Sequence, residues 1–245
     1  MFKPCELIRN QVPRNRLRVR IPCPPLVFQE KPALGFSRQP VLESPKTLQY
    51  DYPELIDATV GKVSRKAYEK YKDDPEAYVK ARRSDARGKV FEATVAHEAN
   101  ERFKLIGRPD RVLTSAAEGD PAHSSDNLLW KEGVIKLRYQ LKSTRNAKSI
   151  IEFLSEPEYM EKYANEVIVT HPDTFNQIAR ELSKRKRLDG SLPPDWQRVD
   201  EAFRAGRVSD EIFPKWKVPT YYEAQQKADD VIRRQFERAR REYGG

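Results

Sequence analysis

A predicted strand over residues 134–142 carries the polar side chains that first point to chemistry. The segment alternates between apolar and polar residues, so Gln140 and Lys142 lie side by side on its polar face. Asp126 begins a preceding predicted strand. If the two strands pair through a hairpin turn at residues 131–133, the Asp126 carboxylate lies beside Gln140 and Lys142. A carboxylate, an amide oxygen and an ammonium group would then lie together, and an acidic residue from an upstream helix would complete the site.

That helix is predicted over residues 86–105, where the apolar side chains step by four along one face: Phe91, Val95, Ala99 and Phe103. Gly107 and Pro109 are expected to end it. Another helix is predicted over residues 63–83, broken and restarted at Asp74 and Pro75. A short strand over residues 110–114 and a loop over 115–125 follow.

The second half of the chain alternates helices with one buried strand. Ser149 and Glu152 have capping-box spacing, which predicts a helix beginning there. A strand over residues 167–169 precedes a helix that runs to Leu182 from Asp173 or Thr174. Thr220 and Glu223 form a second capping-box pattern, which opens a tail helix with this apolar stripe: Ala224, Ala228, Val231, Phe236 and Ala239. This order predicts an α/β (α+β) fold with a mixed central sheet flanked by helices.

Three segments together resemble the PD-(D/E)xK, or restriction-endonuclease-like, nuclease superfamily in a Gln-x-Lys variant. They are Gly-Lys-Val-Phe-Glu at residues 88–92 opening a helix, Asp-Asn-Leu-Leu at 126–129, and Tyr-Gln-Leu-Lys-Ser-Thr at 139–144. The family core has a helix carrying a Glu, a three-stranded meander, a crossover helix and a further strand, which is the order predicted here. The resemblance covers roughly residues 86–182.

The resemblance implies roles for these residues in hydrolysing DNA. Asp126 would be the central ligand of Mg²⁺ or Mn²⁺, with Glu92 as a second carboxylate and Gln140 contributing its amide oxygen. Hard oxygen ligands suit such a cation, which neutralises charge on the scissile phosphate. Lys142 would orient or deprotonate the attacking water and stabilise the transition state. Ser143 and Thr144 would contact substrate phosphate.

The sequence departs from the family pattern at two points and leaves alternatives open. No proline precedes Asp126, and the literal Pro109–Asp110 pair comes too early in the chain. Gln140 stands where the family usually has an acid. Glu98 competes with Glu92, which is favoured because it lies near the predicted helix start and follows Gly88 at the family's spacing. An alternative interpretation takes Gln140 and Lys142 as an ordinary solvated strand face and Asp126 as a turn residue.

Charge and proline content divide the 245-residue chain. Its net charge is +9, and residues 1–50 supply two thirds of this excess with nine basic and three acidic residues; they also hold 8 of the 18 prolines. We therefore predict a proline-rich basic extended arm over 1–50, a nuclease-like core over 51–190 and a C-terminal helical extension over 191–245.

Within the arm, basic residues alternate with other residues: Arg14, Arg16, Arg18 and Arg20. As a strand they would share one face, which favours a phosphate-binding or sheet-augmenting arm; the alternative is an edge strand with a solvated face. A second basic cluster follows a predicted helix: Lys184, Arg185, Lys186 and Arg187. It would clamp a phosphate backbone or simply be a solvated helix end.

Other chemistries find little support. The three histidines, His97, His123 and His171, lack metal-ligand spacing, and the two cysteines cannot supply a zinc site. His171 follows the strand predicted over residues 167–170, so it would lie near the site or, as the favoured alternative, at the surface. Phosphate-cradling glycine loops and the Gly-x-Ser-x-Gly motif are missing, and no apolar run approaches the roughly 18 residues of a membrane helix.

The sequence thus predicts a metal-dependent DNA nuclease of the cytoplasm, from a phage or mobile element. The alternative is a non-catalytic DNA-associated structural or virion protein with a degenerate nuclease-like core, whose basic arm laces it to further copies or to another assembly partner.

Overall fold

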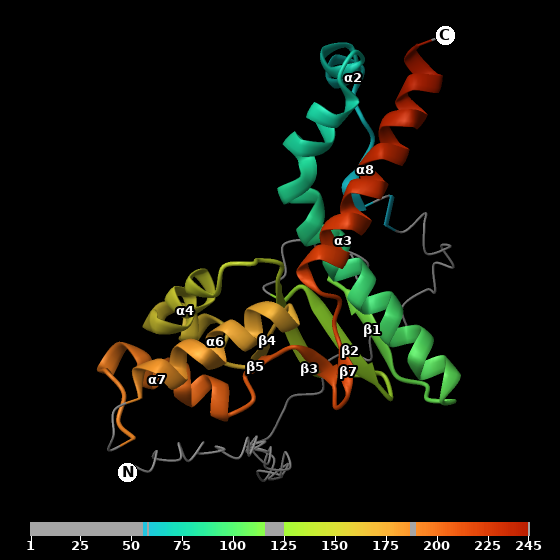
Figure 1. Cartoon of the computed structure of the whole chain (residues 1–245). Helices are drawn as coiled ribbons and strands as arrows, with labels where there is room; N and C mark the ends of the chain where they lie inside the picture. The colour runs from blue at the N-terminus through green and yellow to red at the C-terminus, as the bar shows by residue number, and fades with distance from the viewer. Residues whose placement is uncertain (1–55, 58, 116–124, 187–189, 245) are drawn as a thin grey trace, which may run out of the picture. The chain divides into compact units, whose positions relative to one another are not determined.

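The computed structural model describes residues 56–57, 59–115, 125–186 and 190–244 (Figure 1). These residues belong to one unit, Leu42–Gly245. The predicted arm over residues 1–50, with its four alternating arginines, lies outside the described residues, as do His123 and Arg187.

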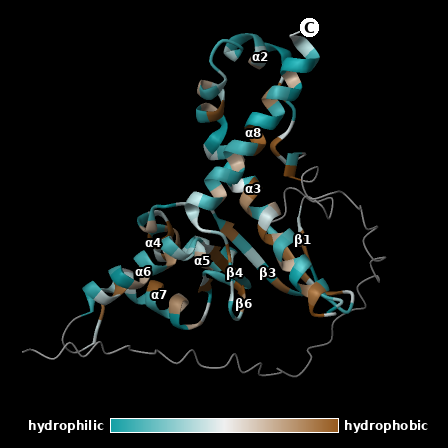
Figure 2. Cartoon of the chain, turned by 45° about the vertical axis from the view of Figure 1, so that its right-hand side comes forward, coloured by the Kyte–Doolittle hydropathy of each residue, from teal (hydrophilic) through white to brown (hydrophobic). Residues whose placement is uncertain are grey.

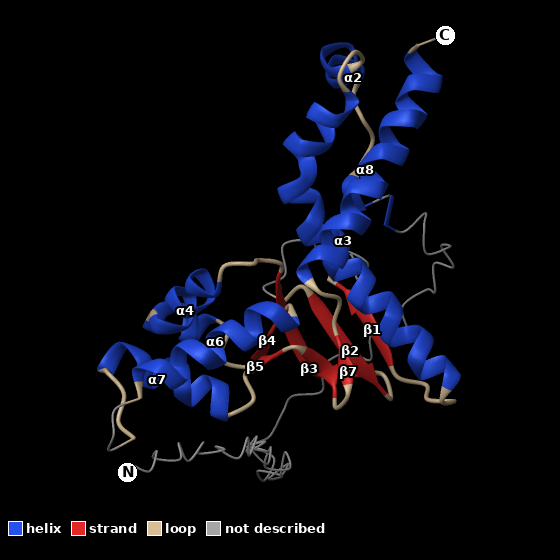
Figure 3. Cartoon of the chain, in the orientation of Figure 1, coloured by secondary structure: helices blue, strands red, loops and turns tan. Residues whose placement is uncertain are grey.

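A five-stranded mixed sheet forms the centre of the described residues (Figure 3). Its strand order is β1-β2-β3-β4-β5; the first three strands are antiparallel, and β4 and β5 run parallel to β3. The predicted combination of a mixed sheet with flanking helices is therefore confirmed. The strands are β1 (Arg111–Thr114), β2 (Asn127–Lys131), β3 (Val134–Lys142), β4 (Glu166–Thr170) and β5 (Val208–Ser209).

The β2–β3 turn is a tight hairpin, as predicted. Glu132 and Gly133 both have positive φ, 54° and 74°, which is the backbone twist that two-residue hairpin loops favour. The register shifts by one residue between Leu129 and Trp130, and beyond this irregularity Asn127 lies opposite Tyr139. This register decides which residues of the two strands meet at the far end of the hairpin.

The longest helix corrects the sequence prediction. α2 (Arg65–Tyr71) ends before Asp74 and α3 (Pro75–Leu105) begins at Pro75, so the predicted break and restart are confirmed. Asp74 caps α3 by accepting a hydrogen bond from the Ala77 N–H. The prediction was wrong in ending one helix at residue 83 and beginning another at 86, because α3 is continuous there. Gly88 lies inside α3 rather than opening a helix, and Glu92 lies past its middle.

Helices cover both faces of the sheet. On one face, the predicted four-residue stripe of α3 packs against Tyr139, Leu141 and Val169. On the other, Ile168 and Val208 pack against three further helices. α4 begins one turn earlier than predicted, because Asn146 and not Ser149 caps it. These helices are α4 (Ala147–Ser155), α6 (Pro172–Arg185) and α7 (Pro194–Arg204), and a short α5 (Pro157–Lys162) follows α4.

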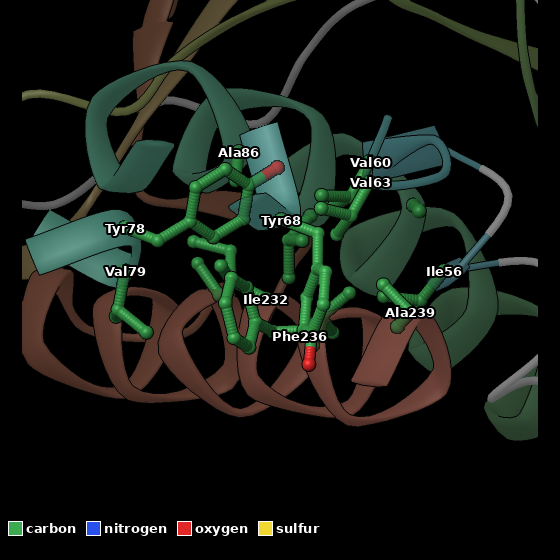
Figure 4. Packing of buried hydrophobic residues seen from close by; sticks show 14 residues of the cluster. Ile56, Val60, Val63, Tyr68, Tyr78, Val79, Ala86, Ile232, Phe236 and Ala239 are labelled. Atoms are coloured by element: carbon green, nitrogen blue, oxygen red, sulfur yellow. The ribbon is translucent and has the colours of Figure 1, made fainter. Parts of the chain in front are cut away.

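Beyond the sheet, α3 packs along α8 (Tyr221–Tyr243), with α2 beside them (Figure 1). Their shared core contains aromatic and aliphatic side chains such as Tyr78, Ile232 and Phe236 (Figure 4). The predicted capping box of Thr220 and Glu223 opens α8, and in Figure 2 hydrophobic positions interrupt the mostly hydrophilic colouring of its ribbon. The predicted apolar stripe of α8 is buried.

Residues 191–245, predicted as a helical extension, also supply strands. β5 joins the main sheet, and β6 (Glu211–Phe213) pairs with β7 (Trp216–Lys217) in a second, two-stranded sheet. Ile212 and Val218 from this region pack into the cluster between α3 and the sheet. Among the described residues, no helix has the length and apolar character needed to cross a membrane.

Candidate functional site

Asp126 lies directly before β2, and the β2–β3 register places it beside the end of β3. Its backbone N–H donates to the Tyr139 carbonyl at 2.9 Å. Its carboxylate Oδ2 accepts from the Gln140 Nε2 at 2.5 Å and from the Leu141 N–H at 2.6 Å. The predicted meeting of Asp126 and Gln140 is thus present in the structure.

Gln140 is buried, with 5% of its surface exposed. Its Nε2 is used by Asp126, but its Oε1 is a buried oxygen without a hydrogen-bond partner among the described residues. An unpaired buried acceptor costs on the order of 1–3 kcal/mol. The polar face of β3 is therefore not an ordinary solvated strand face at this position, and the Gln140 Oε1 is a buried acceptor without a partner among the described residues.

Glu92 comes to the same region from α3. The Asn127 Nδ2 donates to its backbone carbonyl at 3.1 Å, which ties this turn of α3 to β2. Burial raises the pKa of the Glu92 carboxyl to about 7, and the negative charge of Asp126 adds to the rise, while Lys142 and Lys89 oppose it.

The competing acid, Glu98, is engaged elsewhere. Its Oε1 accepts from the Lys227 Nζ of α8 at 2.8 Å. The literal Pro109–Asp110 pair does not join the cluster either, because Asp110 is buried in an ion pair with Arg108. Glu92 is therefore the acid of α3 whose charge couples to Asp126, although it does not lie near the helix start.

Asp126 has a perturbed carboxyl of its own. Burial raises its pKa to about 6; the Leu141 N–H and Lys142 lower it, and the nearby charge of Glu166 raises it. Glu166, the first residue of β4, is 5% exposed and was missed by sequence reasoning. The signal that could have found it was an acid placed directly against the predicted buried strand at residues 167–169.

Lys142 ends β3 and is half-buried. Its Nζ lies 5.2 Å from the centre of the Phe153 ring and 5.9 Å from that of Tyr163. It forms no ion pair within the part of the chain that the structure describes, yet its charge lowers the pKa of both Glu92 and Asp126. The ammonium group thus acts on both carboxyls while resting on aromatic rings.

Carboxylate and amide oxygens are the ligand types that a hard divalent cation prefers. In the described residues, no group of three or more His, Cys, Asp or Glu could hold a metal ion. Two carboxylates of raised pKa and the unpaired amide oxygen of Gln140 make a set that fits Mg²⁺ or Mn²⁺ only if Gln140 supplies a ligand. Such a cation would reduce the cost of ionising both acids.

Ser143 follows Lys142 and is held by a hydrogen-bonded network. Its Oγ lies 2.9 Å from the His171 Nε2, and the His171 Nδ1 lies 2.8 Å from the Pro219 carbonyl oxygen. Because a carbonyl only accepts, the Nδ1 carries the proton and the Nε2 accepts from Ser143. His171 is fully buried, so its predicted surface position is wrong. Arg87 donates to the Ser143 Oγ and carbonyl at 3.3 and 3.2 Å.

Thr144 serves the start of α4 and the contact with α6. Its Oγ1 accepts from the Asn146 N–H at 3.0 Å, and its carbonyl accepts from the Thr174 hydroxyl at 2.6 Å. These bonds hold the chain that leaves β3 in a fixed path. The contact of Thr144 with substrate phosphate stays a prediction.

The second basic cluster makes local contacts instead of joining Asp126. Lys184 and Arg185 both pair with Glu181, at 2.8 and 2.5 Å. The Arg185 guanidinium also lies 3.9 Å from the centre of the Trp196 ring, and Lys186 caps the end of α6. This arrangement is that of a helix end with its own ion pairs, and phosphate binding there stays a prediction.

No family model, curated protein or solved structure matches this chain. The geometry of Asp126, Gln140, Glu92 and Lys142 therefore has to carry the functional argument.

Proposed function

We propose that the protein is a metal-dependent nuclease that hydrolyses DNA phosphodiester bonds. The observation that carries the proposal is the 2.5 Å contact between Asp126 and Gln140 at the end of the β2–β3 hairpin. Glu92 and Lys142 are electrostatically coupled to the same carboxylate. The restriction-endonuclease-like resemblance supports the same residues.

Each side chain has a role that its surroundings support. Asp126, Glu92 and the Gln140 amide oxygen would hold Mg²⁺ or Mn²⁺, which when bound supplies Lewis-acid stabilisation of the phosphate. Lys142 would orient the attacking water and stabilise negative charge. Cation–π contacts with the Phe153 and Tyr163 rings hold its ammonium group in place. The Thr170 hydroxyl donates to the Lys142 carbonyl at 3.0 Å and fixes the end of the strand.

A plasmid-nicking assay with added Mg²⁺ or Mn²⁺ tests the proposal. The wild type is expected to nick, whereas Asp126→Asn and Lys142→Ala reduce the activity by at least about a hundredfold, the range of one transition-state contact. Glu98→Gln is the control variant. It removes an acid of α3 that pairs with Lys227 and lies outside the proposed site. The proposal fails if the wild type does not cleave, or if all three variants cleave like it.

A second candidate is a non-catalytic DNA-associated structural protein. One observation favours it: the Asp126 carboxylate already accepts two hydrogen bonds, so the cluster can serve as a buried structural link without a cation. DNA retention after deletion of residues 1–50 tests this candidate. Full retention by the shortened chain would remove its main support, since it assigns binding and assembly to the basic arm.

A further inference from the structure

Two arginine–tyrosine pairs lie where the chain leaves β3 and α8 begins. The Arg87 guanidinium lies 4.5 Å from the centre of the Tyr221 ring and donates to the Tyr221 hydroxyl at 2.6 Å. The Arg145 guanidinium lies 5.1 Å from the centre of the Tyr222 ring. The two tyrosine rings meet edge to face at 5.8 Å. We call these four residues the arginine–tyrosine patch.

The patch is positive because its arginines lack acidic partners. Among residues that the structure describes, no carboxylate forms an ion pair with Arg87 or Arg145. One turn earlier on α3, Arg83 makes a two-pronged ion pair with Asp229 of α8, at 2.8 and 2.9 Å. At the level of Arg87 the facing residue of α8 is instead Tyr221. Along the same pair of helices, Arg83 is therefore neutralised by a carboxylate, whereas Arg87, one turn nearer to Ser143, is not.

The patch also contains an exposed aromatic side chain, that of Tyr222. Tyr222 is 55% exposed, the only tyrosine above half exposure among the described large hydrophobic residues that lie at the surface. An exposed aromatic ring beside arginines offers a face on which a planar group can stack. Planar groups joined by negative charges are the chemistry of a nucleic-acid strand, where arginines hold phosphates and aromatic rings stack on bases.

The position of the patch relates it to the candidate site. Arg145 follows Lys142 by three residues, and Arg87 holds the intervening Ser143 by its hydroxyl and carbonyl. On α3, Arg87 and Glu92 are about 7.5 Å apart along the axis but about 140° apart around it, so the link to the candidate site passes through Ser143, which directly follows Lys142. A phosphate bound by Arg87 would lie on the Ser143 side of the site.

Resting on the nuclease proposal, we propose that the arginine–tyrosine patch binds single-stranded nucleic acid next to the cleavage site. Arg87 and Arg145 hold backbone phosphates, and the Tyr222 ring stacks on an unpaired base. A base can reach that ring only when it has left its duplex partner. The substrate class is accordingly a single strand, or a duplex with an unpaired segment at the cut.

The experiment measures binding of the full-length protein to a labelled oligothymidine and to a hairpin duplex, by fluorescence anisotropy with a chelator present. Tyr222→Leu is expected to weaken oligothymidine binding about tenfold, the effect of removing one stacked base, and to change duplex binding little. Tyr222→Phe keeps the ring and is expected to bind like the wild type. Equal binding by the Leu and Phe variants would overturn the stacking assignment.

Salt dependence tests the arginines. Removing one arginine–phosphate interaction with a single strand should reduce the slope of log K against log salt by about 0.7, so Arg87→Gln and Arg145→Gln are each expected to flatten it by that amount. Arg87→Gln could change the salt dependence by disturbing Ser143, which Arg87 holds. Arg145 is exposed and makes no hydrogen bond with another described side chain, so Arg145→Gln tests the phosphate contact without that disturbance. Arg241→Gln, at the far end of α8, is the matched charge control. An equal change in that control would overturn the assignment.

The two proposals fail separately. Loss of oligothymidine binding in Tyr222→Leu, with no nicking by the wild type, would leave the strand-binding patch standing and remove the nuclease. If nicking depends on Asp126 but every patch variant binds oligothymidine and duplex as the wild type does, the nuclease proposal stands and the strand-binding patch is refuted.

Discussion

Replacing Glu92 by Gln should stabilise the protein while removing a residue of its candidate site. Burial and the charge of Asp126 raise the pKa of Glu92 from its ordinary 4.5 to about 7. The difference of about 2.5 corresponds, at about 1.36 kcal/mol per unit, to roughly 3 kcal/mol of cost for the ionised carboxylate in the folded state. Glutamine keeps the shape without the charge, so we expect a gain of about 1–3 kcal/mol at pH 8.

The sign of the effect depends on pH. A carboxyl whose folded pKa is raised holds its proton more tightly when folded, so the wild type loses stability as pH rises from about 4.5 to about 7. The variant has no such loss. Its advantage should therefore be small near pH 5, increase through pH 6 and 7, and level off near pH 8.

Urea unfolding followed by tryptophan fluorescence, in a chelator and at each pH, measures this difference. Glu98→Gln is the matched control: it also removes an acid from α3, but one paired with Lys227, so it should be neutral or slightly destabilising without that pH trend. Excess Mg²⁺ should then raise the stability of the wild type more than that of Glu92→Gln. A variant no more stable than the wild type at pH 8, or an advantage independent of pH, would refute the reasoning.

Three further perturbations test other parts of the fold. Burial lowers the pKa of His171 below 6.5, so stability should fall as pH drops through this value, and His171→Asn should reduce that fall in urea titrations. Asp229→Asn breaks the two-pronged pair with Arg83 and should cost about 1–3 kcal/mol in thermal or urea unfolding. Gly133→Ala places a side chain at φ 74° and should cost about 1 kcal/mol by the same measurement; no loss would contradict the hairpin geometry.

The sequence was most informative where structure is local. The alternation of residues 134–142 predicted β3 with its observed bounds, and the hairpin turn at 131–133 predicted that Asp126 meets Gln140. The one-residue register shift between Leu129 and Trp130, which also sets this meeting, was not predicted. The capping box of Thr220 and Glu223 was likewise confirmed. In each case residues close in the chain decide the geometry, so their pattern carries the information.

The errors and omissions arise where distant segments decide. Helix α3 continues through Gly88, because packing against α8 and the sheet outweighs the roughly 1 kcal/mol that an internal glycine costs. The network of Arg87, Ser143, His171 and Pro219 joins four separate segments, so no local spacing could reveal it. Burial of His171 is a property of that packing.

Gln140 explains how an acidic cluster can persist in this core. Asp126 and Glu92 already have raised pKa values because burial disfavours their charged forms, and Glu166 adds to the repulsion at Asp126. A third carboxylate at position 140 would add repulsion, whereas the amide donates to Asp126 at 2.5 Å and keeps one oxygen unpaired. The neutral side chain therefore stabilises the cluster without a cation and still offers a ligand to one. For the cation that we propose, an amide at position 140 in place of a carboxylate would lower the affinity, and it lowers the cost of folding without the cation.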